Sequence, residues 1–142
     1  MVSLNGQSVA AQAPLSETKT QATQVVWQHY IQSWESPDLD AIVSDYSSDS
    51  VLIVNGRIYV GTAQIREVFK CLFQIFDQGA NRIDPAVVRD RIVYITWHFT
   101  PKREFEFFGT DTFVIENGVI SVQTIASPLY ERHSEGLTKV SG

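Results

Sequence analysis

Sulfur and long apolar runs are scarce in this sequence of 142 residues. Its only cysteine is Cys71, which excludes an internal disulfide and a CxxC metal or redox site. No apolar run exceeds four residues, as in residues 51–54, whereas a membrane-spanning helix needs about 20. The first residues also lack the basic and apolar parts of a secretory signal. We therefore expect a cytoplasmic protein with no membrane partner.

Basic residues are the next deficit. The chain has 11 Lys and Arg against 16 Asp and Glu, which gives a net charge of −5. Nucleic-acid-binding domains usually carry a basic surface, so we expect no nucleic-acid partner. The histidines and carboxylates show no metal-ligand spacing, and there is no glycine-rich phosphate loop. We therefore expect neither a metal nor another cofactor.

Aromatic residues, in contrast, are plentiful, with 3 Trp, 5 Tyr and 8 Phe. They must fill a core, line a pocket or cover an interface. Residues 1–16 are small and polar without periodicity, which predicts a disordered arm, and residues 131–142 predict a flexible tail. The length between them fits one domain, residues 17–130.

Three segments in the N-terminal half have helical periodicity. The first ends at Trp34, the second runs from Pro37 to Tyr46, and the third lies between Gly61 and Gly79. Between the second and third helices, Asn55-Gly56 predicts a two-residue hairpin turn. A second such turn is predicted at residues 117–118.

Four later segments alternate between apolar and polar residues, as strands do: residues 83–88, 92–99, 105–115 and 119–127. The order of elements predicts an α+β fold, with three helices packed on one face of a curved antiparallel sheet of about six strands. In the last strand, the alternation assigns Val122 and Thr124 to the inner face. The outer face is half apolar, which predicts a homodimer interface formed by Tyr94, Phe108, Val114 and Ile125.

Several stretches resemble one known group of proteins. These are the ketosteroid isomerase-like and polyketide cyclase-like proteins of the nuclear transport factor 2-like superfamily. The first two helices of those proteins resemble residues 29–43, and the start of their third helix resembles residues 61–67. Their last hairpin resembles residues 109–113 and 117–120. The resemblance implies a cone-shaped sheet around a pocket, often in a homodimer. Relatives include isomerases, polyketide cyclases, dehydratases, epoxide hydrolases and non-catalytic binding modules, so the fold alone does not fix the function.

Asp111 is the leading candidate for a site residue. It shares the inward phase with Gly109 and Phe113, and burial among apolar neighbours raises the pKa of a carboxyl group. The resemblance places Tyr30 and Asp111 on the two hydrogen-bond donors of the ketosteroid isomerase site. We expect these two to be the catalytic or ligand-binding polar residues.

The general base of the isomerases has no counterpart here. The resemblance places that carboxylate on the first strand after the second helix, at Val54 or Leu52, and neither side chain can accept a proton. An epoxide hydrolase would need an arginine where Gly109 stands. A histidine-based dehydratase would need an inward histidine, whereas His98 falls in the outward phase. Whether the protein is an enzyme is therefore left open.

Three functions stay in view. The first is a binding domain whose apolar pocket takes a hydrophobic ligand with an oxygen acceptor. The second is an isomerase-like or cyclase-like enzyme acting on an enolisable carbonyl, with Asp111 as acid and base. The third is a non-catalytic dimerisation or interaction module. The expected pocket lining consists of Trp27, Trp34, Tyr46, Leu52, Val54, Phe69, Phe73, Trp97, Phe113, Val122 and Thr124.

Overall fold

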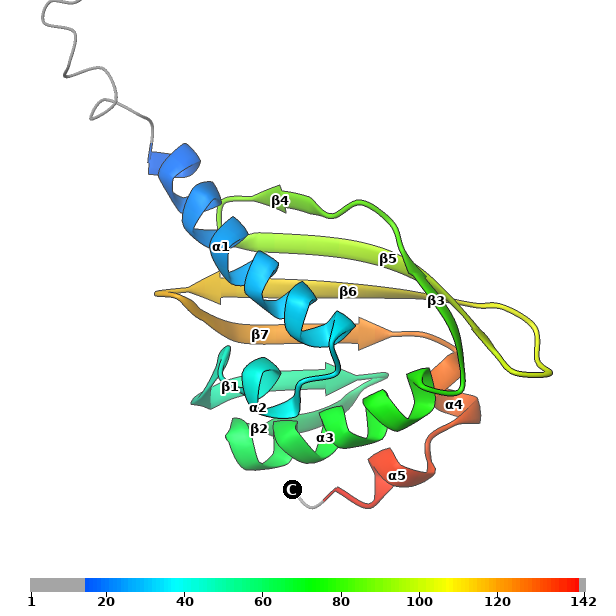
Figure 1. Ribbon diagram of the computed structural model, residues 1–142. Helices are drawn as coiled ribbons and strands as arrows, with labels where there is room; N and C mark the ends of the chain where they lie inside the picture. Colours follow the sequence, from blue (N-terminus) through cyan, green and yellow to red (C-terminus); the bar gives the residue numbers. More distant parts are fainter. Residues whose placement is uncertain (1–14, 141–142) are drawn as a thin grey trace, which may run out of the picture.

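A curved, unclosed sheet with helices across its concave face makes up most of the chain (Figure 1). The computed structural model describes residues 15–140. The elements, in chain order, are α1 (Leu15–Glu35), α2 (Leu39–Val43), β1 (Tyr46–Val54), β2 (Arg57–Val60), α3 (Gly61–Phe76), β3 (Gly79–Ile83), β4 (Val87–Arg89), β5 (Ile92–Pro101), β6 (Phe107–Glu116), β7 (Val119–Ala126), α4 (Leu129–Arg132) and α5 (Glu135–Thr138).

The sheet has seven strands in the order β2-β1-β7-β6-β5-β3, with β4 also paired to β5. The pair β1 and β7 is parallel, and the other pairs are antiparallel. The expected α+β class and the three N-terminal helices are confirmed. The strand expected at residues 83–88 is instead divided into β3 and β4, because Pro85 lacks the N–H that a continuous ladder requires.

Both asparagine–glycine turns form as predicted. Asn55 and Gly56 have φ angles of 48° and 86°, and Asn117 and Gly118 have φ angles of 53° and 76°. Two consecutive residues with positive φ match the twist of a tight hairpin, and asparagine and glycine tolerate that conformation best. These turns join β1 to β2 and β6 to β7.

The predicted phase of β7 is wrong beyond its start. The pairing with β6 changes register between Val114 and Ile115, so that β7 carries one extra residue near Ser121. A one-residue bulge moves every following side chain to the other face. As a result Val122 and Thr124 point away from the core, whereas Ile125, expected on the outer face, is buried with 4% exposure.

The C-terminal segment is also ordered further than expected. Residues 131–142 were predicted as a flexible tail, but α4 and α5 fold against the domain as far as the structure describes them. Leu137 is buried, and the hydroxyl of Tyr59 donates a hydrogen bond to its carbonyl oxygen at 3.0 Å. The predicted disordered arm, residues 1–16, lies outside the described residues except where α1 begins at Leu15.

Aromatic rings fill the space between α1 and the sheet. Trp27 stacks on Tyr30 at 5.6 Å between ring centroids, and both rings meet Phe113 edge-on, at 5.3 and 4.9 Å. Phe105, expected in the inward phase, is 66% exposed because it precedes the first residue of β6. Within residues 15–140, no helix combines the length and apolar character needed to span a membrane.

Candidate functional site

Asp111 lies on the inner face of β6 and is buried, with 6% exposure. Two neighbouring strands each supply one donor to it. Nε1 of Trp97, on β5, donates to Oδ1 at 2.8 Å, and Nε2 of Gln123, on β7, donates to Oδ2 at 2.9 Å. Neither donor carries a charge, so the carboxyl group is held in place without an ion pair.

Burial raises the pKa of Asp111 to about 6, against the lowering effect of the bonds from Trp97 and Gln123. The predicted direction of the shift is confirmed. A pKa this close to neutrality lets the group exist in both protonation states under ordinary conditions. The same side chain can therefore accept a proton or donate one.

Gln123 connects Asp111 to two tyrosines. The hydroxyl of Tyr46 donates to Oε1 of Gln123, which fixes the amide orientation, and Nε2 then donates to Asp111 and, at 3.3 Å, to the hydroxyl of Tyr30. Burial raises the pKa of both phenols, so both stay protonated. Because the Tyr30 oxygen accepts from Gln123, its own hydrogen is free for another acceptor.

Sequence reasoning missed Gln123 because the unbroken alternation assigned it to the outer face. The one signal in the sequence is an uncharged polar residue with full hydrogen-bonding capacity inside an otherwise apolar and threonine-rich strand. Its role follows only from the bulge that turns it inward.

Gly109 makes room for the indole that reaches Asp111. Trp97 pairs with Gly109 across β5 and β6, and a Cβ atom at Gly109 would lie 2.0 Å from the Trp97 ring. Only glycine therefore lets the ring lie flat over the neighbouring strand. The two residues together position Nε1 toward the carboxyl group.

A small cavity of about 20 Å³ adjoins Asp111. That volume is close to the space one water molecule occupies. Most of the wall is apolar, with a few polar groups from different elements. The lining residues are Tyr30, Trp34, Leu72, Phe76, Asn81, Ile83, Ile95, Trp97, Asp111, Ile125 and Tyr130.

An open cleft of about 580 Å³ lies outside this cavity and shares part of its wall. Trp34 and Phe76 line both spaces, and their rings meet edge-to-face at 5.0 Å between centroids. Asn81 and Ile83 also line both spaces, so these four residues form the partition between cleft and cavity. The charged residues of the cleft wall are Glu35 and Asp77.

The residues expected to line a pocket divide into four groups. Asp111, Tyr30, Trp34 and Trp97 come together around the cavity, and Phe73 lines the outer cleft. Val122 and Thr124 face outward because the bulge in β7 turns the side chains that follow it to the other face. The rest pack into the core instead of lining the cavity, because their rings and branched chains fill the inner part of the curved sheet: Trp27, Tyr46, Leu52, Val54, Phe69 and Phe113.

Leu52 and Val54 are completely buried on β1. The position that the resemblance gives to the isomerase base is therefore an apolar wall. Among the residues lining the inner cavity, Asp111 is the only carboxylate. It is therefore the carboxyl group in this lining that can take a proton from a ligand.

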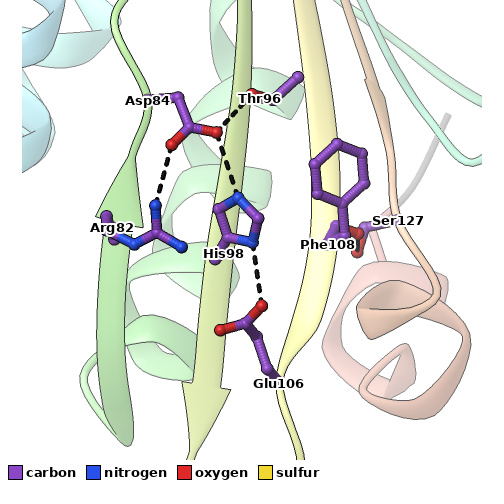
Figure 2. A network of polar contacts seen from close by, with 7 residues as sticks. All are labelled: Arg82, Asp84, Thr96, His98, Glu106, Phe108 and Ser127. Carbon is purple, nitrogen blue, oxygen red and sulfur yellow. Dashed lines mark hydrogen bonds and ion pairs between the residues drawn. The ribbon is translucent and has the colours of Figure 1, made fainter.

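The outer face of the sheet carries the residues that were expected to form a homodimer interface. Tyr94 and Phe108 are 40% and 50% exposed, and Val114, further along β6 on the same face, is partly exposed. Figure 2 shows that His98, on the outer face as predicted, lies beside Phe108 with its two ring nitrogens directed at Asp84 and Glu106. Among residues 15–140, no cluster of His, Cys, Asp and Glu is arranged to hold a metal ion.

The sequence matches the family model of the SnoaL-like domain over residues 27–123. No protein of curated function matches it. The match begins at Trp27, within α1, and ends at Gln123, so it includes Tyr30 and Asp111, whereas α4 and α5 lie beyond it.

Solved structures share the fold at low sequence identity. A candidate ketosteroid isomerase from Kribbella flavida superposes with a TM-score of 0.64 and 12% identity, over 76% of this chain and 78% of that one. A candidate SnoaL-like polyketide cyclase from Shewanella denitrificans gives 0.62 and 17%, over 82% and 96%. A de novo designed protein with a curved β-sheet gives 0.69 and 13%, over 83% and 96%. The resemblance expected from the sequence is confirmed at the level of fold.

Proposed function

Because this chain belongs to the SnoaL-like domain family, we propose that it binds a small, uncharged, mostly apolar molecule, and that the protonated carboxyl group of Asp111 donates a hydrogen bond to an oxygen atom of that molecule. The single observation behind this proposal is a buried carboxyl group, with a pKa of about 6, at a cavity whose walls are largely apolar. Small-molecule sites commonly combine apolar walls with a few convergent polar groups.

The charges around the site favour an uncharged ligand. Asp111 lines the cavity, Glu35 and Asp77 line the cleft, and neither lining contains lysine or arginine. An anionic ligand would therefore meet like charges without a compensating cation. This argues against carboxylate and phosphate ligands.

Access requires the partition to open. The cavity holds about one water, so a larger ligand reaches Asp111 when the partition moves, and separation of the Trp34 and Phe76 rings is one such movement. An edge-to-face ring pair contributes only about 0.5–1.5 kcal/mol beyond its buried area, so a ligand ring can replace one member of the pair. The ligand then extends from Asp111 into the outer cleft.

A second function, proton transfer at an enolisable carbonyl, is favoured by the pKa of Asp111, because an acid–base group acts best when its pKa lies near the working pH. The ionised carboxyl group would take the α-proton, and the free hydrogen of Tyr30 would bond the carbonyl oxygen as it becomes an enolate. The names of the Kribbella and Shewanella neighbours agree with carbonyl chemistry.

Acetophenone, a small neutral ketone with acidic α-hydrogens, tests both functions. We expect the protein to bind it in calorimetry and to speed exchange of its methyl protons for deuterium, followed by proton NMR. Asp111→Asn should abolish the exchange, whereas Asp84→Asn on the outer face should not. Absence of binding would overturn the first function. Binding without proton exchange would support the binding function and reject the proton-transfer function.

The outer sheet face supports a separate proposal about assembly. We propose that Tyr94, Phe108 and Val114 contact a second copy of this chain. Two large aromatic side chains at 40% and 50% exposure on one sheet face are unusual for a surface that meets only water. Ile125 takes no part, since it is buried beside the cavity.

A further inference from the structure

Tyr130 is a buried tyrosine whose hydroxyl the structure leaves unused. It lies on α4, is 2% exposed, and lines the cavity next to Asp111. Its ring meets that of Trp97 at 6.0 Å between centroids. Its hydroxyl bonds none of the residues that the structure describes, and it is not one of their enclosed polar atoms without a partner, so it is open to the cavity. A hydroxyl that is open to a cavity and has no partner within the chain is available to a molecule that enters the cavity.

Other groups already hold α4 in place. Ser127 exchanges backbone-to-side-chain bonds with Asn55, and its own hydroxyl donates to the Phe108 carbonyl at 2.7 Å. On the far side, Nε of Arg132 donates to Glu104 at 2.7 Å. Because these contacts anchor the helix from both ends, the Tyr130 hydroxyl is not needed to dock it.

We propose that Tyr130 donates a hydrogen bond to the oxygen of the bound ligand and is thus a third polar contact beside Asp111 and Tyr30; this rests on the proposed binding function. Tyr130 lies beyond the part of the chain that matches the family model, which ends at residue 123. The contact is therefore a property of this chain's C-terminal segment and distinguishes its site from one built on the matched region alone.

The protonation states fit this role. Burial, together with the nearby charge of Asp111, raises the pKa of Tyr130, so the phenol remains a donor at any ordinary pH. The cavity then presents two phenol donors and one carboxyl group. A ketone with α-hydrogens matches this set. Its oxygen accepts from the phenols and from the protonated form of Asp111, and its α-hydrogen can be taken by the ionised form. The deduced ligand class is a neutral ketone with at least one α-hydrogen.

The test uses Tyr130→Phe, which removes only the hydroxyl, and acetophenone carrying ¹³C at its carbonyl. We expect affinity to fall on the order of 10-fold, the loss of about one hydrogen bond. The infrared carbonyl stretch of the bound ketone should move to higher frequency, because one donor is lost. The denaturant midpoint should stay unchanged or rise, since no bond within the protein is removed.

Tyr59→Phe is the matched control. Its hydroxyl is bonded to Leu137, so that variant should lose stability but keep the affinity and the carbonyl frequency of the wild type. Equal affinity and frequency for wild type and Tyr130→Phe would overturn the role of Tyr130 alone. A destabilised Tyr130→Phe variant would overturn it too, because the hydroxyl would then have a partner within the protein. Failure of the wild type to bind the ketone would instead overturn the proposed function, and this role with it.

Discussion

Trp97 and Asp111 occupy neighbouring strands, and the indole Nε1 of the first donates to Oδ1 of the second at 2.8 Å inside the core. This bond gives a largely buried ionisable group an uncharged partner. Desolvation therefore outweighs hydrogen bonding, and the pKa rises. The pH dependence of stability should report this arrangement directly.

Asp111→Asn should change how stability varies with pH. The folded state raises the pKa of Asp111 from 3.8 to about 6. Its contribution to stability is thus fully present below pH 3.8 and is lost as pH rises through 6. At about 1.4 kcal/mol per pKa unit, the loss is roughly 3 kcal/mol. The free energy of unfolding of the Asn variant, relative to wild type, should increase by about this amount between pH 4 and pH 7.5.

The comparison across pH is the informative one, because Asn keeps only one acceptor oxygen for the two donors and so loses a bond at every pH. Urea denaturation of both proteins at matched pH values measures it, and Asp49→Asn, at an exposed position of β1, serves as the control. A difference that stays constant over this range would show that Asp111 does not titrate abnormally.

Gln123→Leu should raise the pKa of Asp111 further. The bond from Nε2 stabilises the charged carboxyl group and lowers its pKa, so removing that bond favours the protonated form. NMR titration of ¹³C-labelled aspartate carboxyl groups should show a midpoint above 6. Thr124→Val, on the opposite face of the same strand, should leave the midpoint in place. A fall on Gln123→Leu would mean that the amide does not donate to Asp111.

Gly109→Ala should displace Trp97. A methyl group 2.0 Å from the ring cannot be accommodated without movement, and overpacking typically costs about 1–3 kcal/mol. We expect a lower free energy of unfolding in urea and a changed tryptophan emission. Thr112→Ala, on the outward side of the same strand, should change the emission little. Wild-type stability and emission for Gly109→Ala would show that the indole does not lie over this glycine.

Phe108→Glu should produce monomers if the outer sheet face joins two copies. An interface of specific size buries about 800 Å² on each partner, and a carboxylate introduced there must lose its hydration when the two copies associate. Sedimentation at several concentrations gives the mass. Phe105→Glu, which alters an equally large ring at 66% exposure in the preceding loop, should leave the dimer intact. A wild-type monomer, or an unchanged dimer in Phe108→Glu, would contradict the assignment.

Local chemistry made much of the fold predictable. The asparagine–glycine turns specify both hairpins without help from distant residues, and the spacing of Val26, Trp27, Tyr30 and Trp34 fixes the buried face of α1. Asp111 could be assigned to the inner face from the sequence, because the alternation along β6 is unbroken before the register shift between Val114 and Ile115.

What the sequence did not reveal depends on contacts between distant segments. The bulge in β7 is a property of its pairing with β6, so alternation within β7 could not show that Gln123 turns inward. Helices α4 and α5 have four residues each, too few to form without tertiary support, and buried contacts such as those of Leu137 hold them. Tyr130 therefore appeared to end the domain although it lines its cavity.

The most direct measurement of the central claim is a titration of ¹⁵N-labelled protein with acetophenone, observing the three indole Nε1–H signals. The Trp97 hydrogen is bonded to Asp111, and Trp34 is part of the partition, whereas Trp27 lines neither the cavity nor the adjoining cleft. A ketone bound at Asp111 should shift the Trp97 and Trp34 signals together, with one binding constant, and shift Trp27 least. A Trp97 signal that stays fixed while Trp34 moves, or while none moves, would contradict ligand binding at Asp111.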